Sequence, residues 1–381
     1  MMFDVQLGQD PAKCVLRLSL VFGWLTLAQL RFPCALLVPL RRDDGLTYGI
    51  MSRMRNQLLS LGVGAMSLAA VAYPNNYVAD VSTPEKKAEF VRNAWTGRDC
   101  DNRALWPEGK VPLRIHGEKT ALKENEYASA NVILTNVNDP FYRFYPASGD
   151  GMKPCVVICP GGGYFQIGMN KEGTEIQEWL NSIGFSCAIL AYRCGGIDQR
   201  DGALCDAQRL IRLLRKDAKK LGIDPKRIGI IGFSAGANLA IRASTNWRKP
   251  LYGKVDEADD FSCRPDFQLP IYPWDVRVRT KVEKNGWPSA WSNEYDQKTY
   301  PVDKDTPPAF IVQTLDDFCE PQTATTYDYV LKRAGVDSTL KLYQSGGHGY
   351  GLRQLGKPCD LWPYEATSWL ARFAGSPVDG N

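Results

Sequence analysis

The sequence predicts an α/β protein with a mostly parallel central sheet and helices on both faces. Three observations support this fold class. Short apolar runs typical of strands alternate with helical patterns from about residue 150 to the C-terminus. One of these runs, Cys155 to Pro160, is continuously apolar, as expected for a strand that is buried on both faces. The helical patterns between them are long enough to cross over between parallel strands.

The expected elements follow one another in a regular order. Strands are expected at residues 129–137, 141–147, 155–160, 185–192, 227–233, 267–272, 309–314 and 338–343. The first two of these strands suggest an antiparallel start. Helices are expected at residues 171–184, 203–222, 235–244, 321–335 and 361–373. In the first of them Ile176, Trp179, Leu180 and Ile183 share one face, and Gly184 ends the helix.

One connection is too long for a simple crossover. Residues Pro273 to Pro308 lie between two expected strands and carry Trp274, Trp287 and Trp291. We expect a short insertion over one end of the sheet. Its tryptophans could pack in the core or under a lid, and their flat faces would also suit sugar rings.

Composition and charge describe a globular chain rather than a disordered or fibrous one. The 381 residues are 44% hydrophobic and 23% charged, with a net charge of +4. The longest basic cluster, Arg209 to Lys220, is interrupted by apolar residues at helical spacing. We interpret it as the solvated face of an amphipathic helix, with a nucleic-acid-binding patch as the alternative. No nucleic-acid partner is expected.

The cysteines and histidines do not indicate a metal site. Eleven cysteines occur without a C-x-x-C motif, and there are two histidines, His116 and His348. Cys155 and Cys159 share one strand face and lie about 13 Å apart, too far to form a disulfide with each other. We expect them to be small core residues, and we expect no metal or organic cofactor.

The N-terminal region has the layout of an export signal. Residues Met51 to Ala72 contain two arginines, an apolar stretch and an Ala-Val-Ala site. A membrane-anchoring or core helix is the alternative, but the stretch is short for a span of about 20 residues. We expect residues 1–72 to be an upstream extension and signal-like segment, with Met51 or Met54 as the true initiator. We expect 73–104 to be a leader and 105–376 the main α/β domain of an exported protein, without stable membrane insertion.

The stretch G-F-S-A-G at residues 232–236 ends an expected strand and begins an expected helix. The turn must be so sharp that large side chains two residues before and after Ser234 would collide with nearby backbone, which explains Gly232 and Gly236. Ser234 could also be an ordinary turn serine, because a chain with 34 glycines can contain a G-x-S-x-G match by chance. The strand-to-helix context favours a nucleophile, which needs a general base and a carboxylate that orients the base.

The base and the carboxylate are expected after Ser234, because nucleophiles at such turns are followed in the chain by the acid and then the histidine. His348 is the one histidine after Ser234, and it lies in a glycine-rich loop that follows a strand. We interpret it as the general base, with a structural loop residue as the alternative. Asp316 and Asp317 follow the preceding strand. His116 precedes the whole expected sheet and is interpreted as a surface or turn residue.

The glycine run after the 155–160 strand is the expected oxyanion hole. Acyl transfer needs backbone N–H donors after the nucleophile and in an earlier strand-to-helix loop. We assign one donor to Ala235 and the other to Gly162 or Gly163, since three consecutive glycines allow the backbone to approach a carbonyl oxygen closely.

These motifs together resemble a known family. The segments V-V-I-C-P-G-G-G-Y, G-I-I-G-F-S-A-G-A-N-L-A, L-D-D-F-C-E-P and G-G-H-G-Y-G-L are similar to those of α/β-hydrolase esterases related to bacterial acetyl xylan esterases and feruloyl-esterase-like proteins. The resemblance covers about residues 105–373 and implies the α/β-hydrolase fold. It implies Ser234, Asp317 and His348 as the triad, because many such esterases read D-x-x-x-P and Pro321 follows Asp317 at this spacing. Asp316 is the alternative acid, with a cap or turn role otherwise.

The expected function is a serine carboxylesterase that removes short acyl groups, above all acetyl groups, from a small ester or from a polysaccharide such as xylan. Feruloyl or general short-chain ester hydrolysis is the alternative, and peptide hydrolysis is less favoured because no large second domain restricts access. A catalytically inactive hydrolase fold used for binding is the alternative outside the enzymes.

Overall fold

A computed structural model describes residues 2–6, 15–19, 29–31, 101–114, 121–124, 132–283 and 288–374. The chain divides into two units, Met1–Val71 and Ala72–Asn381. In the first unit the strands β1 (Met2–Gln6), β2 (Val15–Ser19) and β3 (Gln29–Arg31) form an antiparallel sheet. The signal-like segment Met51 to Ala72 and His116 lie outside the described residues. In the described ranges, the helices are too short or too polar to cross a bilayer.

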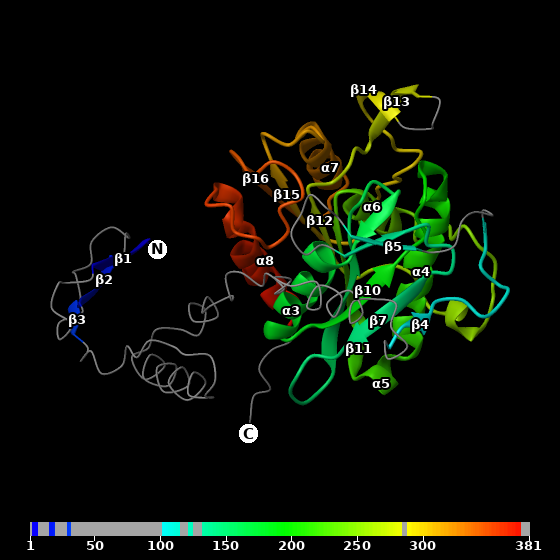
Figure 1. Cartoon of the computed structure of the whole chain (residues 1–381), viewed down its shortest axis with the longest axis horizontal. Helices are drawn as coiled ribbons and strands as arrows, with labels where there is room; N and C mark the ends of the chain where they lie inside the picture. The colour runs from blue at the N-terminus through cyan, green and yellow to red at the C-terminus, as the bar shows by residue number, and fades with distance from the viewer. Residues whose placement is uncertain are drawn as a thin grey trace. The chain divides into compact units, whose positions relative to one another are not determined.

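The second unit is built on an eight-stranded sheet in the order β16-β15-β12-β11-β8-β10-β7-β4 (Figure 1). From β16 to β10 the neighbouring strands are parallel, and β7 and β4 are added antiparallel at one edge. The strands are β4 (Arg103–Ala104), β7 (Phe141–Tyr145), β8 (Lys153–Cys159), β10 (Ser186–Ala191), β11 (Ile223–Phe233), β12 (Gln268–Ile271), β15 (Ala309–Thr314) and β16 (Ser338–Tyr343). The predicted mostly parallel α/β sheet is confirmed.

Helices connect the parallel strands and cover the sheet. They are α3 (Glu175–Ser182), α4 (Arg200–Lys216), α5 (Ala218–Leu221), α6 (Ala235–Thr245), α7 (Gln322–Arg333) and α8 (Trp362–Leu370). The α3 and α8 helices lie side by side (Figure 1). The buried rings of Trp179, in α3, and Trp362, at the start of α8, pack edge to face with centroids 5.2 Å apart. The α4 and α6 helices pack against each other and against β11.

The continuous apolar run at residues 155–160 lies in a buried strand, as its sequence predicts. Every residue of β8 after Lys153 is buried, and so is every residue of β10. Cys155 and Cys159 are fully buried free thiols, consistent with small core residues. All eight cysteines within the described ranges are free.

The expected early strands divide between two sheets. Strand β7 joins the central sheet. Strand β6 (Val132–Thr135) instead pairs antiparallel with β5 (Ala121–Glu124) and β9 (Gln166–Gly168) in a separate three-stranded sheet. Because β9 follows the glycine loop after β8, this small sheet supports that loop from outside the central sheet.

The insertion between β12 and β15 forms a hairpin of β13 (Arg277–Val282) and β14 (Pro288–Tyr295). Trp274 is buried and belongs to the main core, and Trp291 is partly buried against that core. Core packing therefore accounts for Trp274. Trp287 lies outside the described residues.

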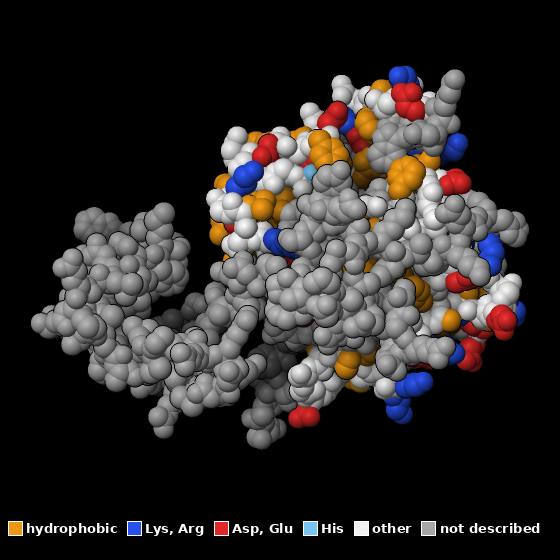
Figure 2. Space-filling view, in the orientation of Figure 1, with side chains coloured by type: hydrophobic (Ala, Val, Ile, Leu, Met, Phe, Trp, Pro, Cys, Tyr) orange, Lys and Arg blue, Asp and Glu red, His pale blue; other side chains and the backbone are white. Residues whose placement is uncertain are grey.

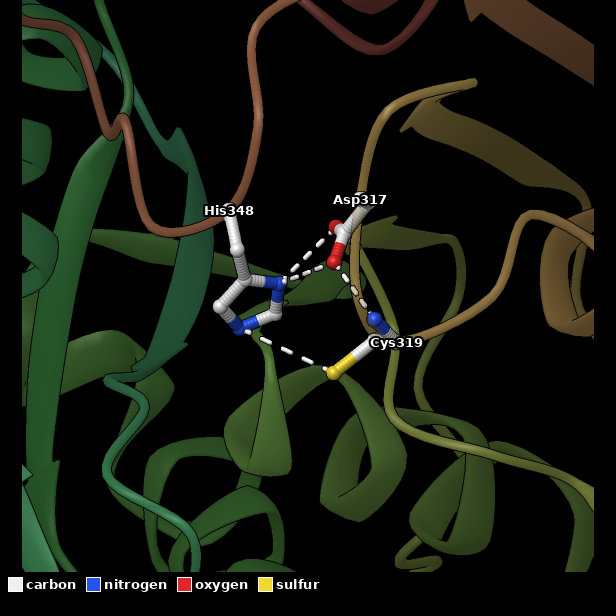
Figure 3. A group of neighbouring side chains, drawn as sticks. All are labelled: Asp317, Cys319 and His348. Carbon is white, nitrogen blue, oxygen red and sulfur yellow. Dashed lines mark hydrogen bonds and ion pairs between the residues drawn. The ribbon is translucent and has the colours of Figure 1, made fainter.

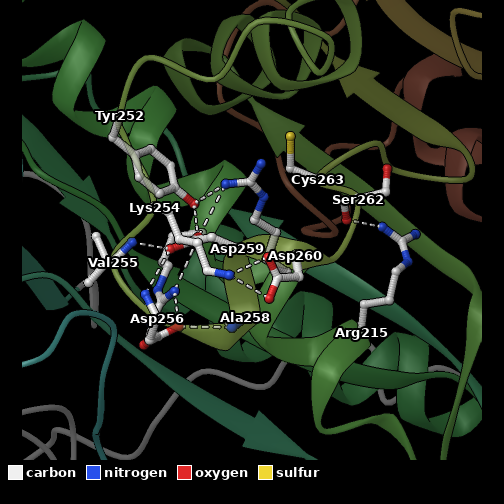
Figure 4. A network of polar contacts seen from close by, with 12 residues as sticks. Arg215, Tyr252, Lys254, Val255, Asp256, Ala258, Asp259, Asp260, Ser262 and Cys263 are labelled. Atoms are coloured by element: carbon white, nitrogen blue, oxygen red, sulfur yellow. Dashed lines mark hydrogen bonds and ion pairs between the residues drawn. The ribbon is translucent and has the colours of Figure 1, made fainter.

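The interpretation of the basic cluster Arg209 to Lys220 as a solvated helix face is wrong for its first half. Arg209 and Arg212 are 2% and 9% exposed. The acidic segment before and within the short helix η5 (Glu257–Asp260) covers this side of α4, as Figure 4 shows around Tyr252 and Asp259. Both arginines lie 3.2 Å from a carboxylate oxygen of Asp259.

Pairing explains how these cations can be buried. A guanidinium removed from water needs a carboxylate partner to offset its lost hydration. Arg209 also pairs with Asp256, and the hydrogen bonds from Arg209 lower the pKa of Asp256 to about 2. On the described surface in Figure 2, basic and acidic side chains lie interspersed. Arg209 and Arg212 are therefore buried ion-pair residues, whereas Lys219 and Lys220 are exposed.

Candidate active site

The turn between β11 and α6 places Ser234 in a strained backbone conformation. Its φ is 53°, in the region that glycine favours and most other residues avoid. A Cβ on Gly232 would lie 2.0 Å from the carbonyl oxygen of Gly236, and a Cβ on Gly236 would lie 2.0 Å from that of Cys159. Both glycines are therefore required by close backbone contacts, as the motif predicts.

Three side chains from separate loops meet at this turn. Ser234 Oγ lies 2.8 Å from His348 Nε2. On the other side of the ring, His348 Nδ1 lies 2.8 Å and 2.9 Å from the two carboxylate oxygens of Asp317. Asp317 follows β15 and His348 follows β16, so adjacent parallel strands bring both loops to the same end of the sheet (Figure 3).

The two candidate acids have different surroundings. The Asp317 side chain is fully buried, and the Cys319 N–H donates a 2.7 Å hydrogen bond to it. Asp316 points elsewhere and accepts hydrogen bonds from the N–H groups of Gly346 (2.9 Å) and Gly347 (2.7 Å). These backbone donors, Gly347 first, lower the pKa of Asp316. The structure thus brings Asp317 to the imidazole, and Asp316 instead holds the loop that precedes His348.

The glycine loop after β8 lies beside the serine. A Cβ on Gly161 would lie 3.0 Å from Ser234 Cβ. Gly162 and Gly163 have φ of 140° and 67°, and the Gly162 carbonyl accepts hydrogen bonds from the N–H groups of Phe165 and Gln166, both at 3.1 Å. Ala235 is the first residue of α6, so its N–H has no carbonyl one turn earlier in the helix to bond. The expected donors therefore come from two segments that meet at Ser234.

A buried carboxylate that the sequence analysis did not single out connects this loop to the histidine loop. Glu172 is 6% exposed and accepts hydrogen bonds from the Gly161 N–H and the Tyr272 hydroxyl, both at 2.7 Å. The Tyr272 oxygen accepts in turn from the Gly351 N–H at 3.1 Å. Burial and the neighbouring Glu172 raise the pKa of Tyr272 well above its ordinary value, so its hydroxyl remains a donor. An acidic residue in the first turn of a helix is commonly exposed, so the sequence carried no signal for this role.

We expect Glu172→Gln to lower the free energy of unfolding by about 1–3 kcal/mol and to reduce turnover. Each carboxylate oxygen of Glu172 accepts from one of these partners, and in a glutamine one of the two oxygens is replaced by an NH₂ donor that would face either the Gly161 N–H or the Tyr272 hydroxyl. Urea unfolding and steady-state kinetics would measure both effects. Glu175→Gln is the matched control, because Glu175 pairs at 2.7 Å with the partly exposed Arg353 and should contribute at most about 1 kcal/mol. Equal behaviour of the two variants would contradict the linking role of Glu172.

Aromatic and sulfur groups complete the surroundings of His348. The Tyr272 ring centroid is 5.0 Å from the imidazole centroid, and that of Phe318, which is 78% exposed, is 4.5 Å away. Within the described ranges, Asp317, Cys319 and His348 form the one group whose ligand atoms lie close enough together to hold a metal ion. The sequence analysis did not single out Cys319.

A mostly parallel sheet with a strained strand-to-helix serine, followed by acid and histidine loops, defines the α/β-hydrolase fold. By fold this chain is an α/β hydrolase, and residues 143–270 match the BD-FAE family. An acetylxylan esterase of Xylanibacter ruminicola is 29% identical over 248 residues, which are 62% of this chain and 48% of that protein. The resemblance to acetylxylan esterases that the motifs indicate is confirmed.

Solved structures agree with this assignment. An acetyl ester-xyloside bifunctional hydrolase from Caldicellulosiruptor lactoaceticus superposes with a TM-score of 0.58 at 29% identity, covering 72% of this chain and 97% of that one. An esterase of Thermogutta terrifontis shares the fold, with a TM-score of 0.52 at 20% identity over 65% of this chain and 94% of its own. Among curated relatives, the endo-1,4-beta-xylanase B of Butyrivibrio fibrisolvens is 27% identical over 60% of this chain. The chain spans 48% and 36% of the two curated relatives named here.

Proposed function

We propose that this protein is a serine carboxylesterase with Ser234 as nucleophile, His348 as general base and Asp317 as the orienting carboxylate. The observation that carries the proposal is the 2.8 Å contact between Ser234 Oγ and His348 Nε2 at a strained turn. A serine hydroxyl is a weak nucleophile until a neighbouring base accepts its proton. Asp317 lies against Nδ1, which leaves Nε2 free to act as that base.

The mechanism follows from these positions. Ser234 Oγ attacks the ester carbonyl while its proton passes to His348 Nε2. The N–H groups of Ala235 and of Gly162 or Gly163 stabilise the negative charge that develops on the carbonyl oxygen. His348 then donates its proton to the leaving alcohol, which produces an acyl-enzyme on Ser234. Water, deprotonated by His348, attacks this intermediate and releases the acid.

The proposed substrate is a short acyl ester, above all acetyl on a polysaccharide such as xylan. The names of the acetylxylan esterase and of the acetyl ester-xyloside hydrolase support this choice. We further propose that residues 105–376 form the catalytic domain and that the signal-like segment Met51 to Ala72 directs export, because a polymeric substrate lies outside the cell.

The purified protein is expected to release acetate from acetylated xylan, measured by an enzyme-coupled acetate assay. Feruloylated arabinoxylan and aryl esters of increasing acyl length should be tested in parallel. Release of ferulate without acetate would favour the feruloyl alternative, and activity confined to aryl esters would indicate a general short-chain esterase. Folded protein that hydrolyses no ester and resists a fluorophosphonate probe would overturn the proposal in favour of an inactive, binding hydrolase fold.

A further inference from the structure

A cysteine thiol lies beside the imidazole at a position that the proposed mechanism does not use. Cys319 Sγ is 4.0 Å from His348 Nε2, on the loop that also carries Asp317 (Figure 3). Cys319 is partly exposed, whereas the other described cysteines are buried. The sulfur therefore lies close to the ring nitrogen that the proposed mechanism uses.

The spacing of sulfur and nitrogen suits a soft divalent cation. Zinc binds cysteine sulfur at about 2.3 Å and histidine nitrogen at about 2.0–2.1 Å in tetrahedral geometry, which places the two ligand atoms about 3.6 Å apart. The observed 4.0 Å separation exceeds this value by an amount that a small side-chain rotation can remove. Ser234 Oγ, 2.8 Å from Nε2, is close enough to approach the same ion.

The surroundings of the imidazole also match those of a metal ligand. Metal-binding histidines commonly donate the N–H of the other ring nitrogen to a carboxylate, which fixes the tautomer and raises the basicity of the ligating nitrogen. Asp317 accepts from Nδ1 at 2.8 Å in this way. It therefore directs the Nε2 lone pair toward the side on which Cys319 Sγ and Ser234 Oγ lie.

We propose that Cys319 Sγ and His348 Nε2 form an inhibitory binding site for soft divalent cations such as Zn²⁺ and Cd²⁺, with Asp317 as the outer carboxylate. On binding, the thiol releases its proton to solvent, and the thiolate and the Nε2 lone pair coordinate the ion without any change of oxidation state. The occupied lone pair can no longer accept the Ser234 proton. Hydrolysis stops for as long as the ion is bound, and a chelator restores it.

The test combines a binding readout with an activity readout. Cd²⁺ titrated into the full-length protein should produce the ultraviolet absorption of a cadmium–thiolate bond, in wild type and in Ser234→Ala. Cys319→Ser should lose this absorption, and Cys263→Ser, which changes a buried thiol bonded to the Trp247 carbonyl, should retain it. Because the absorption requires no turnover, this arm remains valid even if the proposed esterase function fails.

The activity arm depends on the proposed function. Zn²⁺ should inhibit ester hydrolysis by wild type and by Cys263→Ser, and Mg²⁺ should not, because it prefers oxygen ligands. Cys319→Ser should remain active and require at least about tenfold more Zn²⁺ for the same inhibition. Cys319→Ala provides a second variant if the serine form folds poorly. Equal Zn²⁺ sensitivity of wild type and the Cys319 variants, or unchanged cadmium–thiolate absorption in them, would overturn the site.

Discussion

Ser234→Ala is expected to lower kcat/KM for ester hydrolysis by about 10⁴-fold or more, the scale associated with loss of a member of a serine triad. The substitution removes the only atom that would form the acyl-enzyme and keeps the Cβ. The backbone strain at φ 53° is therefore unchanged, and the fold should be retained. Initial rates with an aryl acetate, fluorophosphonate labelling and thermal unfolding together measure the effect.

Ser244→Ala provides the matched control for this experiment. Ser244 is a fully buried serine of α6, the helix that begins directly after Ser234, and its hydroxyl has no hydrogen-bond partner among the described residues. Its loss should leave both labelling and turnover close to those of wild type. Labelling that persists in Ser234→Ala and disappears in Ser244→Ala would show that the nucleophile had been assigned to the wrong serine.

Asp317→Asn is expected to reduce kcat by about 10⁴-fold with little loss of stability. An asparagine can turn its NH₂ group toward Nδ1, which places the imidazole proton on Nε2 and removes the lone pair that faces Ser234. Steady-state kinetics with an aryl acetate and a urea unfolding curve would measure the two effects separately.

Asp316→Asn separates the two neighbouring acids. Its remaining carbonyl oxygen can still accept a hydrogen bond from Gly346 or Gly347, so the histidine loop should largely keep its position and turnover should fall far less. A larger loss in Asp316→Asn than in Asp317→Asn would reverse the assignment of the acid.

Much of the fold could be predicted from the sequence because its signals are local. The apolar run within β8 is uninterrupted from Cys155 to Cys159, so its burial on both faces could be predicted from composition alone. The sharp turn at Ser234 could be predicted for the same reason, because its two flanking glycines are required by contacts within one turn and with the neighbouring strand.

Other features could not be predicted because they depend on which segments meet in space. Arg209 and Arg212 have the same helical spacing as solvated cations, and their burial arises from an acidic segment about fifty residues later in the chain. Glu172 is in the same situation, because its partner Tyr272 is 100 residues away. A pattern read along one segment contains no information about such a partner.

The amino-acid sequence by itself determined the alternation of strands and helices, the sharp turn at Ser234 and the order in which acid and histidine follow it. Those properties arise from backbone sterics and apolar periodicity within short segments. Only the tertiary structure decided that Asp317 rather than Asp316 faces His348, that Glu172 joins two loops and that Cys319 lies beside the imidazole. Each of these depends on the direction in which a side chain leaves its loop, and that direction is set by hydrogen bonds and packing from distant parts of the chain.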